Sequence, residues 1–112
     1  MDLIRKLHKE EERLLFFLVN KSDIQIPTSL LTEIRVKPLK DGGMGSLLLI
    51  PKGLTFDSER FFGKRISECQ FIDKDKINVI ASLNIDDKGN LFELDIWKTD
   101  FSPLIKISEK LK

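Results

Sequence analysis

The strongest constraint on the fold is a pair of alternating segments near the C-terminus that together predict a β-hairpin. Apolar side chains recur at every second position over residues 77–85 and again over residues 92–96, the spacing of strands that bury one face. The joining segment 86–90 contains the glycine that a tight turn requires. A loop of two or four residues keeps apolar side chains opposite each other, whereas a three-residue loop shifts them to opposite faces. The two-residue loop Lys88-Gly89 gives the pairs Ile85–Phe92, Leu83–Leu94 and Ala81–Ile96.

The N-terminal part of the chain predicts one amphipathic helix. Glutamates occupy residues 10–12, in its first turn, where the positive end of the helix dipole favours carboxylates. His8 stands at the capping position, and Glu11 follows three residues later as in a capping box. An apolar stripe follows, formed by Leu14, Leu15 and Leu18. The polar residues 20–23 end the helix.

Further strands are predicted between this helix and the hairpin. Apolar or small side chains alternate with charged ones over residues 32–38, and residues 47–50 form a continuous apolar run typical of a central strand. The stretch 58–69 has apolar residues at helical spacing but contains Gly63, so we predict a turn or short helix there, then a strand over Ser67–Asp73. A loop at residues 74–76 gives the pairs Phe71–Val79 and Cys69–Ala81.

These elements sum to one helix packed on an antiparallel sheet of about five strands, an α+β fold. The connections between strands are short, which favours antiparallel pairing because a parallel pair needs a crossover of roughly a dozen residues or more. The helix and the sheet each have one apolar face, so we expect two layers. With 112 residues, of which 41% are hydrophobic, the chain suits a single α+β domain over residues 1–112.

Composition argues against several classes of function. A formal net charge of +1 argues against nucleic acid as a partner, because binding its backbone needs a surplus of cations. The apolar run 14–19 is much shorter than the roughly 20 residues that span a membrane, and it follows acidic residues, unlike the core of a signal peptide. A lone cysteine cannot form an internal disulfide. We therefore expect a cytoplasmic protein with no membrane partner.

The chain offers few residues for catalysis. It has one histidine, His8, and one cysteine, Cys69, so a catalytic triad or a zinc site would have to be built around them or completed by another chain. His8 lies at the predicted helix start, and Cys69 alternates with Phe71 in a predicted strand. These positions favour a capping or exposed histidine and a buried, inert thiol. We predict no catalytic residue, no metal and no cofactor, so an enzyme is the less favoured reading.

A glycine-rich loop, Asp41-Gly42-Gly43-Met44-Gly45-Ser46, precedes the central strand. Backbone N–H groups of such loops can cradle a phosphate. A phosphate-binding P-loop continues with Lys-Ser/Thr and a helix, whereas this loop continues into the predicted strand Leu47–Ile50. The pattern favours a hairpin turn or bulge built on positive φ angles. It leaves a candidate loop site consisting of Asp41, Gly42, Gly43 and Gly45.

One face of the last hairpin carries polar side chains. Glu93, Asp95 and Trp97 alternate with the apolar residues of their strand, so they share its opposite face. The predicted register places Asn84 beside Glu93 and Ser82 beside Asp95. Three uses fit this face: a solvated sheet surface, a protein-binding patch anchored by Trp97, or a carboxylate pair for acid–base or metal chemistry. An exposed Trp97 would favour contact with a partner.

Residues 41–46 and 93–104 also form two distinctive motifs. They read D-G-G-M-G-S and E-L-D-I-W-K-T-D-F-S-P-L. Together they resemble a small bacterial domain family of unknown function, over most of the chain, and this resemblance implies no particular activity. In size the chain is also similar to immunity proteins that neutralise bacterial toxins, a likeness of architecture without a motif behind it.

These features predict a small, non-enzymatic interaction domain of bacterial type, with an immunity-type inhibitor as its most specific form. The expected partner is another protein, bound through Glu93, Asp95, Trp97, Ser82 and Asn84. A homo-oligomer could also form through an exposed sheet edge. The alternative is a small-molecule-binding domain or enzyme with a carboxylate-lined pocket between helix and sheet, using Asp95, Glu93 or Asp41.

Overall fold

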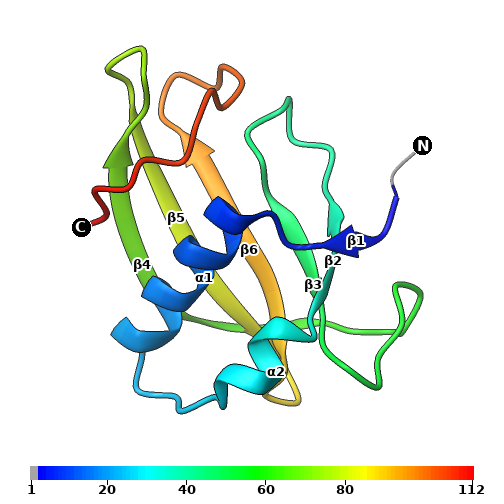
Figure 1. Ribbon diagram of the computed structural model, residues 1–112. Helices are drawn as coiled ribbons and strands as arrows, with labels where there is room; N and C mark the ends of the chain where they lie inside the picture. The colour runs from blue at the N-terminus through cyan, green and yellow to red at the C-terminus, as the bar shows by residue number, and fades with distance from the viewer. Residues whose placement is uncertain (1–2) are drawn as a thin grey trace.

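A six-stranded antiparallel sheet with a helix across one face is the framework of the computed structural model, which describes residues 3–112 (Figure 1). The elements along the chain are β1 (Arg5–Lys6), α1 (Lys9–Lys21), α2 (Thr28–Thr32), β2 (Arg35–Pro38), β3 (Leu47–Ile50), β4 (Phe62–Ile72), β5 (Asn78–Asp86) and β6 (Leu91–Lys98). The strand order is β1-β2-β3-β6-β5-β4, and every neighbouring pair is antiparallel. The predicted α+β class is confirmed. The sequence does not predict β1, because a strand of two residues is too short to show a period of two.

Helix α1 forms where the sequence predicts it. The Glu11 carboxylate accepts a hydrogen bond from the backbone N–H of His8 at 2.8 Å, which is one half of the predicted capping box. The same carboxylate pairs with Arg5 at 2.8 Å, so it ties the start of the helix to β1. The helix packs on β4 and β5. Its stripe of fully buried leucines consists of Leu14, Leu15 and Leu18.

Most of the predicted strand pairing is confirmed. On the inner face of the β5–β6 hairpin, which α1 covers, the pairs are Leu83–Leu94 and Ala81–Ile96. On its outer face the pairs are Asn84–Glu93, Ser82–Asp95 and Ile80–Trp97. The β4–β5 hairpin contains the pairs Phe71–Val79 and Cys69–Ala81. The alternation in the sequence therefore assigns the side chains of β6 to the two faces correctly.

The predicted pairing is wrong at the β5–β6 turn. Ile85 pairs with Leu91 rather than with Phe92. The turn is wider than a two-residue loop, because the Asp86 N–H donates to the Asn90 carbonyl at 2.8 Å and the Asp86 carboxylate accepts the Asn90 N–H at 2.9 Å. The wider turn leaves Phe92 as the extra residue of a β-bulge.

Residues 58–69 also differ from the prediction of a turn or short helix. Strand β4 already begins at Phe62 and runs to Ile72. Gly63 allows this strand to approach the β5–β6 turn, because a Cβ at position 63 would collide with the carbonyl oxygen of Asp86. Two register shifts interrupt the pairing of β4 with β5. Because of these shifts, the sequence of the first half of β4 does not show the period of two that is typical of a strand.

The strand predicted over residues 32–38 is shorter in the structure. Residues 28–32 form α2, and β2 begins at Arg35. The Pro27 carbonyl accepts the N–H groups of Leu30 and Leu31, and the fixed φ of proline suits a helix start. Leu31 is 4% exposed and belongs to the core cluster. Tertiary packing therefore outweighs the alternating pattern here.

A buried ion pair closes the end of the sheet where β3 and β6 separate. The Arg60 Nε lies 2.9 Å from the Asp86 Oδ2, and the guanidinium also donates to the carbonyls of Leu49 and Leu91. Burial opposes the charge of Asp86, but hydrogen bonds from the Asn90 N–H and Arg60 outweigh it and lower the pKa of this carboxyl. Arg60 thereby supplies donors that a neighbouring strand would supply elsewhere in the sheet.

A second buried ion pair lies at the other end of β5. Lys98, the last residue of β6, is fully buried, and its Nζ lies 2.9 Å from the Asp73 Oδ2 and 2.6 Å from the Asp75 Oδ2. The Asp73 carboxylate also accepts the backbone N–H groups of Ile105 and Lys106. This pair therefore anchors the C-terminal segment to the β4–β5 turn.

Candidate functional site

The outer face of the sheet, opposite α1, carries the polar side chains that the sequence analysis identifies. Asp95 is exposed, Glu93 is half-buried, and Trp97 is 39% exposed. On the neighbouring strand, Ser82 and Asn84 are each 8% exposed. The structure therefore brings all five residues together, but Ser82 and Asn84 form the floor of this face rather than its contact surface.

Phe101, which the sequence analysis does not identify, extends this face. Its ring centroid lies 5.9 Å from that of Trp97, with the planes tilted by 54°, an attractive arrangement for aromatic rings. Phe101 is 68% exposed. Its φ of 64° lies in the left-handed region that residues other than glycine rarely adopt. We name Glu93, Asp95, Trp97 and Phe101 the aromatic–acid patch.

A tight turn after β6 holds Phe101 in this position. The Phe101 N–H donates to the Lys98 carbonyl at 2.8 Å, and the Asp100 carboxylate accepts the N–H of Ser102 at 3.0 Å. The Asp-Phe-Ser-Pro sequence is a recognisable turn signal. It does not reveal that the Phe101 ring turns back toward Trp97, because that contact depends on the strained backbone.

The two carboxylates of the patch lie outside the ion pairs that the described residues form. Neither Glu93 nor Asp95 forms an ion pair within residues 3–112. Burial raises the pKa of Glu93 and the negative charge of Asp95 raises it further, which together outweigh the opposing effects of a hydrogen bond from Asn84 and the positive charge of Arg60. The folded protein therefore disfavours the charged form of Glu93, and a cation from a partner would reduce this free-energy cost.

The glycine-rich loop is a hairpin turn between β2 and β3, and two of its backbone N–H groups bond to a carboxylate of the loop itself. The Asp41 carboxylate accepts the backbone N–H groups of Met44 at 3.0 Å and Ser46 at 2.9 Å. Such N–H groups would otherwise be available to cradle a phosphate, so the loop already holds an anionic group. As the sequence predicts, positive φ angles occur at Gly42, Gly43 and Gly45.

This loop also packs against the C-terminal segment, so the two motifs of the sequence meet in space. The Leu104 N–H donates to the Gly43 carbonyl at 3.0 Å. Ser46 is 4% exposed, and its Oγ accepts the Ile96 N–H at 2.9 Å and lies 3.3 Å from the Asp95 carboxylate. The loop therefore supports one end of the aromatic–acid patch.

Apolar side chains fill the space between α1 and the sheet. Leu14, Leu15 and Leu18 are fully buried there, in the same core cluster as Leu83 and Leu94. The carboxylates considered for a pocket in this space lie elsewhere, in the β2–β3 loop and on the outer face: Asp41, Glu93 and Asp95. The geometry thus gives no support to a carboxylate-lined pocket between helix and sheet.

The remaining reactive groups are placed for structural roles. Cys69 is 1% exposed, and burial raises the pKa of its thiol, which makes it a poor nucleophile. The His8 side chain is 63% exposed at the start of α1. Among residues 3–112, no group of three or more His, Cys, Asp or Glu side chains is arranged to hold a metal ion. The patch therefore offers carboxylates and aromatic rings for contact with another molecule.

Comparison with known proteins places the chain in one family. The model of a family described as a domain of unknown function matches residues 4–108. No curated protein and no solved structure matches the chain. Within the part of the chain that the structure describes, no helix is long and apolar enough to cross a membrane.

Proposed function

We propose that this chain, which belongs to the DUF6984 family of domains of unknown function, is a non-enzymatic interaction domain that binds another protein through the aromatic–acid patch. The observation that carries this proposal is the exposed pair of Trp97 and Phe101, 39% and 68% exposed. The pair stands beside the carboxylates of Glu93 and Asp95, on the face that α1 leaves uncovered.

The physical case rests on the strain and exposure of this aromatic pair. A left-handed φ at a residue such as Phe101 costs about 1 kcal/mol, and burial does not offset this cost because the ring is 68% exposed. Strained residues of this kind concentrate at binding and switch sites. Tryptophan is also among the residues that most often dominate the energy of protein interfaces.

The acidic residues of the patch indicate the chemistry of the partner. Glu93 and Asp95 lie two positions apart on one face of β6, with no ion-pair partner among the described residues. A partner with lysine or arginine opposite them would relieve their repulsion and speed association. The interface we propose therefore has an aromatic centre and an acidic rim, and the partner has an apolar pocket bordered by cations.

In its most specific form, the proposal is an immunity-type inhibitor of another bacterial protein, acting in the cytoplasm. The carboxylates of the patch support this form if the inhibited protein acts on nucleic acid. Such proteins carry cationic surfaces, and an acidic patch can cover a cationic surface. The buried Cys69, a free cysteine, suits a reducing compartment. Pairing of two copies through the edge of β4 has less support, because Lys21 Nζ and the Lys112 N–H already bond to carbonyls of that edge.

Affinity capture with the full chain tests the proposal. Wild type is compared with Trp97→Ala and with Leu30→Ala, a control that removes an apolar side chain of similar exposure (48%) from α2. A specific partner should bind wild type and Leu30→Ala, and its affinity for Trp97→Ala should fall by about 2 kcal/mol or more, as at interface hot spots. Equal binding by all three folded proteins would contradict the proposal.

A further inference from the structure

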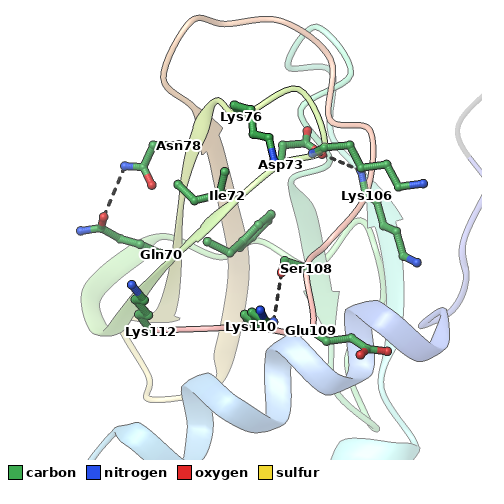
Figure 2. Close-up of a pocket in the computed structure, with 12 residues that line it drawn as sticks. Gln70, Ile72, Asp73, Lys76, Asn78, Lys106, Ser108, Glu109, Lys110 and Lys112 are labelled. Carbon is green, nitrogen blue, oxygen red and sulfur yellow. Dashed lines mark hydrogen bonds between the residues drawn. The ribbon is translucent and has the colours of Figure 1, made fainter.

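A cavity of about 810 Å³ lies between the β4–β5 hairpin and the C-terminal segment, and it shares no residue with the aromatic–acid patch (Figure 2). The C-terminal segment leaves the edge of β4 where the Asp73 carboxylate accepts the N–H groups of Ile105 and Lys106, at 2.9 and 3.0 Å. It returns where the Lys112 N–H donates to the Gln70 carbonyl at 2.9 Å. These hydrogen bonds bound the cavity at both ends.

Lysines surround this cavity. Its lining includes Lys74, Lys76, Lys106, Lys110 and Lys112. Two carboxylate side chains also line it, but Asp73 is paired with the buried Lys98 at 2.9 Å, and Glu109 points away from Ile72 in Figure 2. None of the five lysines has an ion-pair partner within residues 3–112. In a chain with a net charge of +1, this is a local concentration of positive charge.

The edge of β4 adds backbone groups to the cavity. Alternate residues of this strand face away from β5: the Glu68 carbonyl accepts from Lys21 Nζ, and the Gln70 carbonyl accepts from the Lys112 N–H. By the same alternation, the N–H and carbonyl of Ile72 also face outward. Ile72 lines the cavity and its side chain is 53% exposed. Its N–H is therefore a donor available to a bound anion.

The size and closed ends of the cavity favour a compact ligand over a polymer. Its volume lies within the roughly 300–1,000 Å³ typical of small-molecule sites. A nucleic-acid strand or an extended peptide would have to break the bond between Gln70 and Lys112 to pass along the edge of β4. Lysine ammonium groups bind phosphate as point charges, and a phosphate group brings up to two negative charges with few atoms.

We propose that this cavity binds a compact ligand that carries two or more phosphate groups. The rim lysines, Lys76 and Lys110 among them, meet the charge of the phosphates, and the Ile72 N–H donates to one of their oxygens. The site is separate from the aromatic–acid patch. Phosphate binding in this cavity does not depend on the proposed protein-binding function, so each can be tested without the other.

Titration of the full chain with inorganic triphosphate tests this proposal, with calorimetry for affinity and amide chemical shifts for location. We expect saturable binding at one site, with the Ile72 amide among the shifted signals. The double variant Lys76→Gln/Lys110→Gln should weaken binding about tenfold or more. The control Lys9→Gln/Lys40→Gln removes the same charge from exposed lysines outside the cavity and should leave the affinity unchanged.

Several results would overturn this proposal. Binding that does not saturate, or an equal loss in both double variants, would show general charge attraction. Equal affinity for citrate, a compact polycarboxylate, would remove the preference for phosphate. Tighter binding of a single-stranded oligonucleotide than of triphosphate, lost with Lys76→Gln/Lys110→Gln, would assign the surface to nucleic acid instead.

Discussion

The two faces of β6 differ in where their side chains find their partners. On the inner face, Leu94, Ile96 and Lys98 are between 0% and 1% exposed, and all of their contacts lie within the chain. On the outer face, Asp95 and Trp97 are exposed to solvent. Successive residues of β6 thus have different surroundings, because a strand points its side chains alternately to opposite faces.

The charges on the two faces differ in the same way. Burial works against the charge of Lys98, but hydrogen bonds to Asp75 and Asp73 outweigh it and raise the pKa of this lysine. On the outer face, burial and the charge of Asp95 raise the pKa of Glu93. The fold therefore favours the charged form of Lys98 and disfavours the charged form of Glu93. This difference teaches that the fold stabilises the charge on the inner face of β6, whereas the outer face leaves the Glu93 charge disfavoured and Trp97 exposed, as the proposed recognition role requires.

The largest effect expected from this comparison is the loss of an inner leucine. Leu94→Ala should lower the free energy of unfolding by about 4 kcal/mol, because it leaves a cavity in the core. Asp95→Ala, one position away on the outer face, should change it by less than about 1 kcal/mol. Urea unfolding measures both variants. Similar losses for the two would erase the distinction between the faces.

The buried ion pair on the inner face gives the next largest effect. Asp73→Asn should lower the free energy of unfolding by about 3 kcal/mol, because the buried Lys98 then loses one of its carboxylate partners. The exposed Asp87→Asn, which removes the same charge, should have little effect.

This effect should also depend on pH. Burial opposes the charge of Asp73, but hydrogen bonds from the Ile105 N–H and Lys98 outweigh it and lower the pKa of this carboxyl. The charged carboxyl therefore contributes stability above the ordinary aspartate pKa of about 3.9, and this contribution is lost as the pH falls through its lower folded value. The gap between wild type and Asp73→Asn should be constant near neutral pH and shrink in acid. A gap that persists unchanged in acid would contradict the assignment.

On the outer face, Phe101→Gly should change stability little. Glycine adopts a φ of 64° without strain, and this gain offsets the lost contact with Trp97, so the free energy of unfolding should change by less than about 1 kcal/mol. Affinity for the captured partner should nevertheless fall, since the exposed ring is gone. Phe101→Ala is the control that removes the ring but keeps the strain. Unchanged affinity in both variants would exclude Phe101 from the interface.

Glu93→Gln should give the smallest effect, and in the opposite direction. A carboxyl whose folded pKa is raised penalises the fold above that pKa, and the penalty vanishes below the unfolded pKa. The variant should therefore be more stable at neutral pH by about 0.3 kcal/mol once solvent screening is counted, with no gain in acid. Unfolding at both pH values measures this difference. A loss of stability at neutral pH would show that the Glu93 charge supports the fold.

The sequence predicts the parts of this structure that are governed by local patterns. The inner and outer faces of β6 follow from a period of two, and α1 follows from its stripe and its cap. The β5–β6 turn shows the limit of this approach: hydrogen bonds to Asp86 widen it, and the pairing of Ile85 shifts by one residue. The alternating pattern does not reveal such a shift, because two- and four-residue loops both pair Ile85 with Phe92, and the bulge at Phe92 departs from that alternation.

Other features depend on contacts between distant segments. The alternation of β6 places Lys98 on the apolar face, but its partners, Asp73 and Asp75, come from another turn. Gly63 weakens a helix in the sequence but serves a close approach to Asp86 in the structure. For the candidate site, the side of Trp97 is predictable, whereas its exposure depends on the path of the C-terminal segment.

The free energy of unfolding of Trp97→Ala, measured in urea beside Leu94→Ala, tests the central claim most directly. If the outer face of β6 serves recognition, Trp97→Ala should lower the free energy of unfolding by only about 1 kcal/mol, far less than Leu94→Ala. A loss of about 3 kcal/mol or more, as for a buried aromatic residue, would show that Trp97 belongs to the core and would contradict the proposed patch.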